Sequence, residues 1–93
     1  MITVSIQIGN SDNKLTQSEW GAFCNEVHAL ILAHEGQIHF SAPSVGWADW
    51  QNAAWVFVID EEQAIYLQRY LSVVRAKYKQ DSLAWTQGET IFI

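Results

Sequence analysis

The apolar run over residues 53–59 constrains the fold of this chain more than any other feature. Its side chains are apolar on both alternating sets, which is typical of a strand covered on both faces. Asp60 follows directly and begins a segment of helical periodicity that continues to Tyr78. Gln63 stands three positions after Asp60, where it would complete a capping box. The run therefore predicts a central strand that passes straight into a capped helix.

The N-terminal third of the chain predicts a second pair of elements. Residues 2–8 alternate strictly between apolar and polar side chains, as a half-buried strand does. Thr16 and Glu19 have the spacing of a capping box, and the apolar spacing that follows predicts a helix over residues 18–34, which Gly36 ends.

Three shorter segments complete the pattern. Residues 37–41 and 83–86 each predict a short strand, and residues 90–93 predict a further strand or an extension of the last one. The order strand, helix, strand, strand, helix, strand is that of a ferredoxin-like fold. We therefore expect residues 1–93 to form a single α+β domain, a ferredoxin-like βαββαβ unit with an antiparallel sheet and two helices on one face.

Two helices can cover only one face of such a sheet. On the third strand the side chains that point away from the helices are apolar, and uncovered apolar surface usually marks an interface. The apolar segment Ile91, Phe92 and Ile93 could add a strand to a neighbouring subunit. These features predict a homodimer or a higher homo-oligomer. The alternative is that the long loop before the third strand folds back over the patch.

That loop, residues 42–52, holds the candidate binding site. Three of the five tryptophans fall within nine positions, at 47, 50 and 55, and rigid amphipathic rings in a loop often contact a ligand or a partner. The predicted ligand-binding or partner-binding residues are Trp47, Trp50, Trp55, His39, Gln51 and Asn52.

Three interpretations of this loop stay open. The rings could be contact residues for another protein, or they could have only the structural role of covering the sheet. They could also stack on a small nucleotide, with Gln51 and Asn52 bonding to the base edge. Phosphate contacts would then come from Lys14, Arg69 or Arg75.

Composition narrows the class of partner. Ten acidic and five basic residues give a net charge of −5, which argues against general nucleic-acid binding. The single cysteine, Cys24, excludes an internal disulfide and is expected in the core. The sequence has no signal-peptide pattern and no apolar stretch long enough for a membrane-spanning helix, so we expect a cytoplasmic protein without membrane contact.

The sequence offers little for catalysis. His28, His34 and His39 lack the spacing of a metal site, and neither a nucleophile elbow nor a phosphate-binding glycine loop is present. We therefore expect a non-enzymatic protein with no catalytic residue, metal or cofactor. The alternative is a small hydrolase that uses His39 with Asp49.

Three segments carry a resemblance to a known group of proteins. They are IGNSDNKLTQSEW at 8–20, WQNAAW at 50–55 and YKQDSLA at 78–84, and they resemble short uncharacterised accessory proteins of tailed bacteriophages. The resemblance implies a protein that acts in the host cytoplasm, either by binding a host defence protein or by sequestering its nucleotide signal. It assigns no functional residues, and the few basic residues favour the protein partner.

Overall fold

The computed structural model describes residues 1–46 and 48–93. Within them, two helices connect strands of one four-stranded sheet. In chain order the elements are β1 (Ile2–Gly9), the short 3-10 turn η1 (Ser11–Asn13), α1 (Gln17–Ala33), β2 (Gln37–Pro43), β3 (Asn52–Ile59), α2 (Glu61–Lys77) and β4 (Ala84–Gly88).

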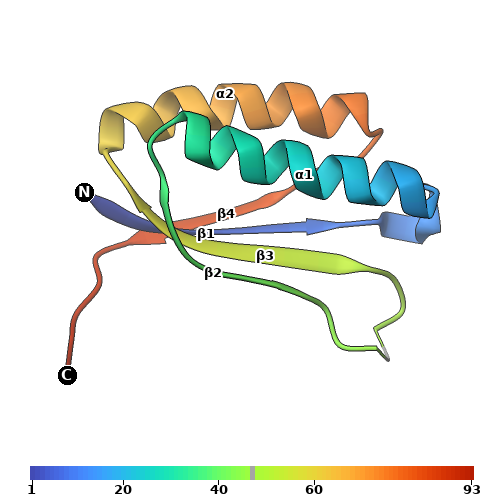
Figure 1. The fold of residues 1–93 in the computed structure, drawn as a ribbon, viewed down its shortest axis with the longest axis horizontal. Coiled ribbons are helices and arrows are strands. Elements are labelled where there is room, and N and C mark those ends of the chain that lie inside the picture. Colours follow the sequence, from blue (N-terminus) through green and yellow to red (C-terminus); the bar gives the residue numbers. More distant parts are fainter. Residues whose placement is uncertain (47) are drawn as a thin grey trace.

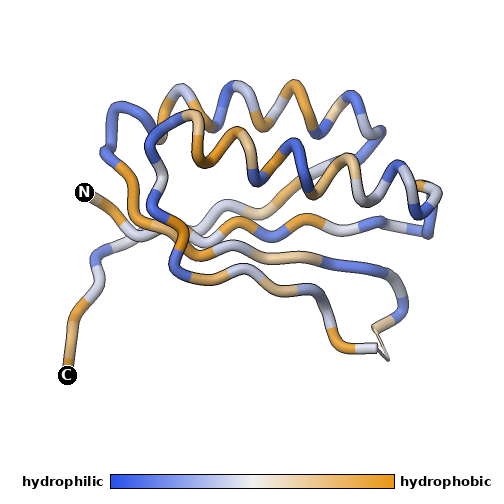
Figure 2. Tube along the Cα trace, in the orientation of Figure 1, coloured by the Kyte–Doolittle hydropathy of each residue, from blue (hydrophilic) through white to orange (hydrophobic). Residues whose placement is uncertain are grey.

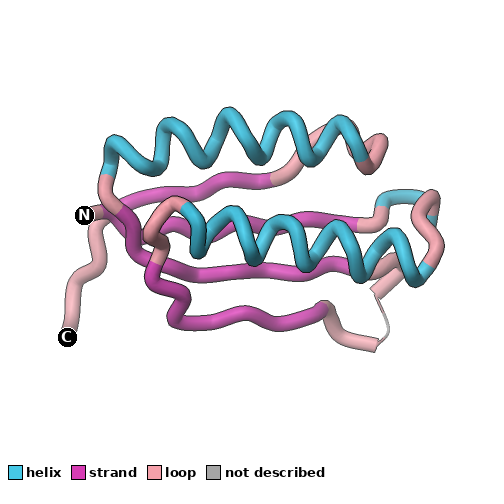
Figure 3. Tube along the Cα trace, turned by 45° about the horizontal axis from the view of Figure 1, so that its top comes forward, coloured by secondary structure: helices cyan, strands magenta, loops and turns pink. Residues whose placement is uncertain are grey.

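The sheet has the strand order β2-β3-β1-β4, and every neighbouring pair is antiparallel. Both helices lie on one side of it, so the molecule has two layers (Figures 1 and 3). This arrangement confirms the predicted ferredoxin-like α+β fold, with the first and third strands at the centre.

The core lies between the sheet and the helices. Alternation along β1 turns Ile2, Val4, Ile6 and Ile8 toward the helices, and all four are buried. Leu15, which precedes α1, is also buried. The other buried apolar residues of the layer come from β3, α1 and α2: Trp55, Phe57, Ile59, Phe23, Val27, Ile31, Ala64, Leu67 and Leu71.

In residues 1–46 and 48–93 no layer covers the opposite face of the sheet, and this changes one prediction. The sequence predicted that β3 is buried on both faces, but Ala54, Val56 and Val58 stay partly exposed on the open side. Beside Val56 on β2 lies Phe40, whose side chain is 54% exposed. Within the described part of one chain, β3 is therefore covered on the helix side only.

The predicted last strand is also wrong. Residues 90–93 follow β4 without strand structure. The pairing of β4 with β1 ends at Gly88 opposite Thr3, near the start of β1, so almost no strand remains for the following residues to pair with. The Thr3 and Thr90 hydroxyls form a hydrogen bond, and the chain then leaves the sheet on the side away from the helices (Figure 1).

Residues 91–93 are apolar and exposed to solvent. Ile91, Phe92 and Ile93 are all exposed, and the hydropathy colouring shows this end as hydrophobic (Figure 2). We call these three residues the C-terminal segment. No helix in the described ranges is both long and apolar enough to cross a membrane.

Candidate functional site

The tryptophan loop connects β2 and β3 at one end of the sheet. Trp47 lies outside the described residues. Trp50 has a 38% exposed side chain and lies at a hollow of about 400 Å³. The hollow is lined by Asn13, Gln17, Trp20, Pro43, Ser44, Val45, Gly46, Ala48, Asp49, Trp50, Gln51 and Asn52.

Gln51 ties this loop to the start of α1. Its side-chain amide forms a reciprocal pair with Gln17, at 2.8 and 3.0 Å, and its Oε1 also accepts from Asn10 Nδ2 at 3.3 Å. The backbone carbonyl of Gln51 accepts from the Asn10 N–H at 2.8 Å. The sequence predicts that the side-chain amide of Gln51 binds a ligand. In the structure this amide is already hydrogen-bonded to other residues of the chain.

Asn10, which bonds to Gln51, is a structural residue that the sequence analysis did not identify. It is buried, and its side chain accepts from the Leu15 N–H at 2.9 Å and donates to the Leu15 carbonyl at 3.1 Å. These bonds hold the turn between β1 and α1. The only sequence signal is an asparagine directly after Gly9, which also fits an ordinary turn residue.

Asn52 closes the loop at its base. Its backbone N–H donates to Ser44 Oγ at 3.0 Å, and its carbonyl accepts from the Ser44 N–H at 2.8 Å. The side-chain Nδ2 donates to the carbonyl of Trp50 at 2.9 Å. Asn52 thus fixes the backbone that presents Trp50.

Trp55 lies away from the hollow, in the core. Its side chain is 4% exposed, and its Nε1–H donates to Nδ1 of His28 at 3.1 Å. That bond requires the His28 ring to have an unprotonated Nδ1. Of the predicted rings in the described residues, only Trp50 reaches the hollow.

His39 lies at the other end of β3 from Trp50. A register shift between Ile38 and Phe40 leaves it in a bulge opposite the last part of β3. It lines a second hollow, of about 540 Å³, on the open side of the sheet, together with Met1, Thr3, Val56, Val58, Glu89, Thr90 and Phe92. His39 therefore lies apart from the described residues of the tryptophan loop.

In the described residues, the groups that could serve catalysis are not brought together at one hollow. Asp49 lines the loop hollow and His39 the other one, so the pair needed for the hydrolase alternative is separated. Burial raises the pKa of the Cys24 thiol, which keeps it protonated. Across residues 1–46 and 48–93, no group of three or more His, Cys, Asp and Glu side chains is placed to hold a metal ion.

Comparison with known proteins gives independent support for the fold. No protein family matches the sequence, and no curated protein matches it significantly. The structure is similar to a dimeric ferredoxin-like protein of unknown function from Thermobifida fusca. The TM-score is 0.63 at 13% identity, over 97% of this chain and 92% of that one. At this identity the likeness establishes the fold alone.

Proposed function

We propose that the protein is a non-enzymatic binding domain that works as a homodimer and recognises another protein. The observation that carries the proposal is the apolar surface of the open sheet face. It includes Phe40, Val56 and Val58 and continues, through the hollow beside His39, onto Phe92. Exposed apolar surface that runs over a sheet face and a projecting segment is typical of an interface.

A second copy of the chain is the occupant that fits the open face. Two sheets pack face to face when both present apolar side chains, and each supplies the layer that the other lacks. The C-terminal segment projects on that same side and would lie against the partner (Figure 1). The similar Thermobifida fusca protein is itself dimeric, which supports this assembly.

The tryptophan-loop hollow supports a protein partner over a nucleotide. Its described lining includes the carboxylate of Asp49 and no lysine or arginine. An anionic phosphate would meet a negative side chain there, in a protein of net charge −5. A half-exposed Trp50 on an anchored loop suits a contact residue in a protein interface. That the partner is a host defence component rests on the resemblance to phage accessory proteins.

The dimer is tested by mass measurement on two matched variants. Val56→Asp places a charge on the open face, whereas Val73→Asp places it on the exposed surface of α2. We expect multi-angle light scattering to give a dimer for the wild type and the Val73 variant and a monomer for the Val56 variant. A wild-type monomer at high concentration would contradict the proposal.

The partner class is tested at Trp50. We expect the wild type to capture a specific host protein, Trp50→Ala to lose it, and Ile65→Ala, an exposed change on α2, to retain it. A panel of nucleotides and cyclic nucleotides should leave the tryptophan fluorescence unchanged. Saturable quenching that Trp50→Ala abolishes would instead establish a nucleotide-binding protein.

A further inference from the structure

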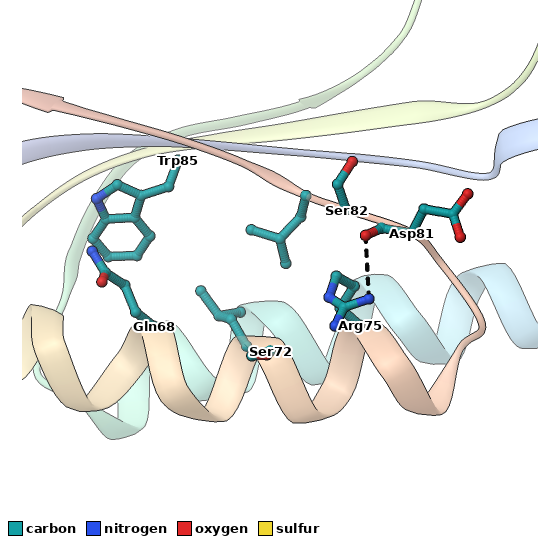
Figure 4. Close-up of a pocket in the computed structure, with 8 residues that line it drawn as sticks. Gln68, Ser72, Arg75, Asp81, Ser82 and Trp85 are labelled. Atoms are coloured by element: carbon teal, nitrogen blue, oxygen red, sulfur yellow. Dashed lines mark hydrogen bonds between the residues drawn. The ribbon is translucent and has the colours of Figure 1, made fainter.

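A groove lies on the helix side of the sheet, between α2 and the edge strand β4 (Figure 4). Its volume of about 540 Å³ falls within the range of small-molecule sites. The lining residues are Gln68, Leu71, Ser72, Arg75, Asp81, Ser82, Leu83 and Trp85. Among the residues that the structure describes, neither the open sheet face nor the tryptophan loop lines this groove.

Arg75 places a fixed positive charge at one end of the groove. Its Nη1 donates to the carbonyls of Gln80 at 2.6 Å and Asp81 at 3.3 Å, so the guanidinium is held by the turn before β4. Figure 4 shows the Asp81 carboxylate turned away from it. Among the residues that the structure describes, no carboxylate forms an ion pair with Arg75.

The two other basic side chains of α2 are differently placed. Lys77 pairs with Glu26 at 2.6 Å, and Arg69 lies over the Tyr66 ring on the exposed surface. Arg75 differs from both because it lines a groove with apolar walls and, among the described residues, has no carboxylate partner.

Those walls come from Leu71, Leu83 and Trp85. Leu71 is buried, whereas Leu83 and Trp85 are partly exposed toward the groove. The Trp85 ring is fixed in place, because its Nε1–H donates to Gln87 Oε1 at 2.8 Å and its plane meets Phe57 edge-on. Trp85 lies beside Gln68, away from the Arg75 end (Figure 4).

We infer that this groove binds a small elongated carboxylate with a hydrocarbon body. The carboxylate bonds to the Arg75 guanidinium, which suits planar oxyanions, and the hydrocarbon covers the apolar walls as far as Trp85. Along α2, Gln68 and Arg75 are seven residues apart, or roughly 10 Å at the helical rise, so the ligand is longer than a simple acetate. The net charge of −5 favours a monoanion over a phosphate of higher charge.

Octanoate serves as the probe, and the indole N–H signals in ¹H–¹⁵N NMR spectra of the intact protein serve as the readout. Trp85→Phe identifies the Trp85 signal. We expect that signal to shift saturably with octanoate, and octanol to bind about tenfold or more weakly, because it cannot form the charged hydrogen bonds.

Three variants locate the site. Arg75→Gln should weaken octanoate binding about tenfold or more, and Arg69→Gln, which removes the same charge from the same helix, should not. Ser72→Phe should block the groove while leaving Arg75 and its turn in place, so it covers the case in which the Arg75 variant fails to fold. A Trp85 signal that does not saturate, or that responds equally in all three variants, would overturn the inference.

Discussion

At the scale of single residues, the end of α1 shows why a glycine stands where it does. The sequence predicts that Gly36 stops the helix through its conformational freedom, but the residue with left-handed backbone is Glu35, at φ 63°. Gly36 is needed for space instead. A Cβ there would lie 2.5 Å from Cγ2 and 2.9 Å from the carbonyl oxygen of Ile31.

This geometry predicts opposite outcomes for neighbouring substitutions. Gly36→Ala should lower the free energy of unfolding by about 1–3 kcal/mol, because the buried Ile31 and the helix end must shift. Glu35→Gly should leave stability unchanged or raise it by up to about 1 kcal/mol, since glycine tolerates positive φ. Urea unfolding of both variants checks the pair, and a Gly36→Ala protein as stable as wild type would contradict the steric explanation.

At the scale of elements, the two helices begin differently although both have capping sequences. Thr16 Oγ1 accepts from the Glu19 N–H at 3.1 Å and Glu19 Oε1 accepts from the Thr16 N–H at 2.9 Å, which confirms the predicted box. Asp60 is the N-cap of α2, but its side chain makes no capping hydrogen bond, so the predicted box with Gln63 is wrong.

The difference can be measured by alanine substitution. Thr16→Ala should cost about 1 kcal/mol of unfolding free energy, as loss of a bonded N-cap does. Asp60→Ala should cost less, about 0.3–1 kcal/mol, because only the favourable charge near the helix N-terminus is lost. Thermal unfolding of the two variants side by side tests this, and equal losses would show that Asp60 caps in solution.

The two helices are joined by an ion pair that makes stability depend on pH. The hydrogen bond from Lys77 holds the pKa of Glu26 below its ordinary value of 4.5. A lowered folded-state pKa contributes stability that is present above pH 4.5 and is lost as the pH falls through the folded value. Glu26→Gln should therefore reduce this acid dependence of the unfolding midpoint. Glu35→Gln, an exposed change away from both helix N-termini, serves as the control.

Local sequence patterns predict an element well when residues close to it in the sequence determine its structure. Alternation along residues 2–8 and the helical spacing after Thr16 gave β1 and α1 nearly to the residue. The candidate site was less predictable, because Gln51 is engaged by Gln17, 34 positions away in the chain. The bulge that turns His39 toward the open face likewise depends on the pairing of β2 with β3, which sequence spacing does not reveal.

At the scale of the whole molecule, the surface has two sides, to which we assign different proposed roles. On the helix side lies the Arg75 groove, and on the open side lie Val56, Val58 and the hollow beside His39. Sequence alone indicated an uncovered apolar face, because two helices cannot cover both sides of the sheet. It could not indicate the direction of the C-terminal segment, which depends on where β1 stops pairing with β4.

That direction makes the segment a specific part of the proposed dimer. Phe92 lines the hollow beside His39 and Val58, yet its side chain is 92% exposed in the single chain, so most of its surface is available to a second copy. Covering a phenylalanine side chain is worth about 1.5–3 kcal/mol, and each dimer contains two such segments. Phe92→Ser should therefore weaken dimerisation by at least about tenfold.

Sedimentation of Phe92→Ser and Val73→Ser over a range of concentrations measures this effect. Val73 is also exposed and apolar, at 67%, but it lies on α2, so its serine variant should keep the wild-type dimerisation constant. The midpoint of thermal unfolding should also rise with protein concentration in the wild type and less so in Phe92→Ser, because association stabilises only the folded chain. If Phe92→Ser instead dimerises like the wild type while Val56→Asp does not, the sheet faces alone hold the dimer and the segment remains outside it.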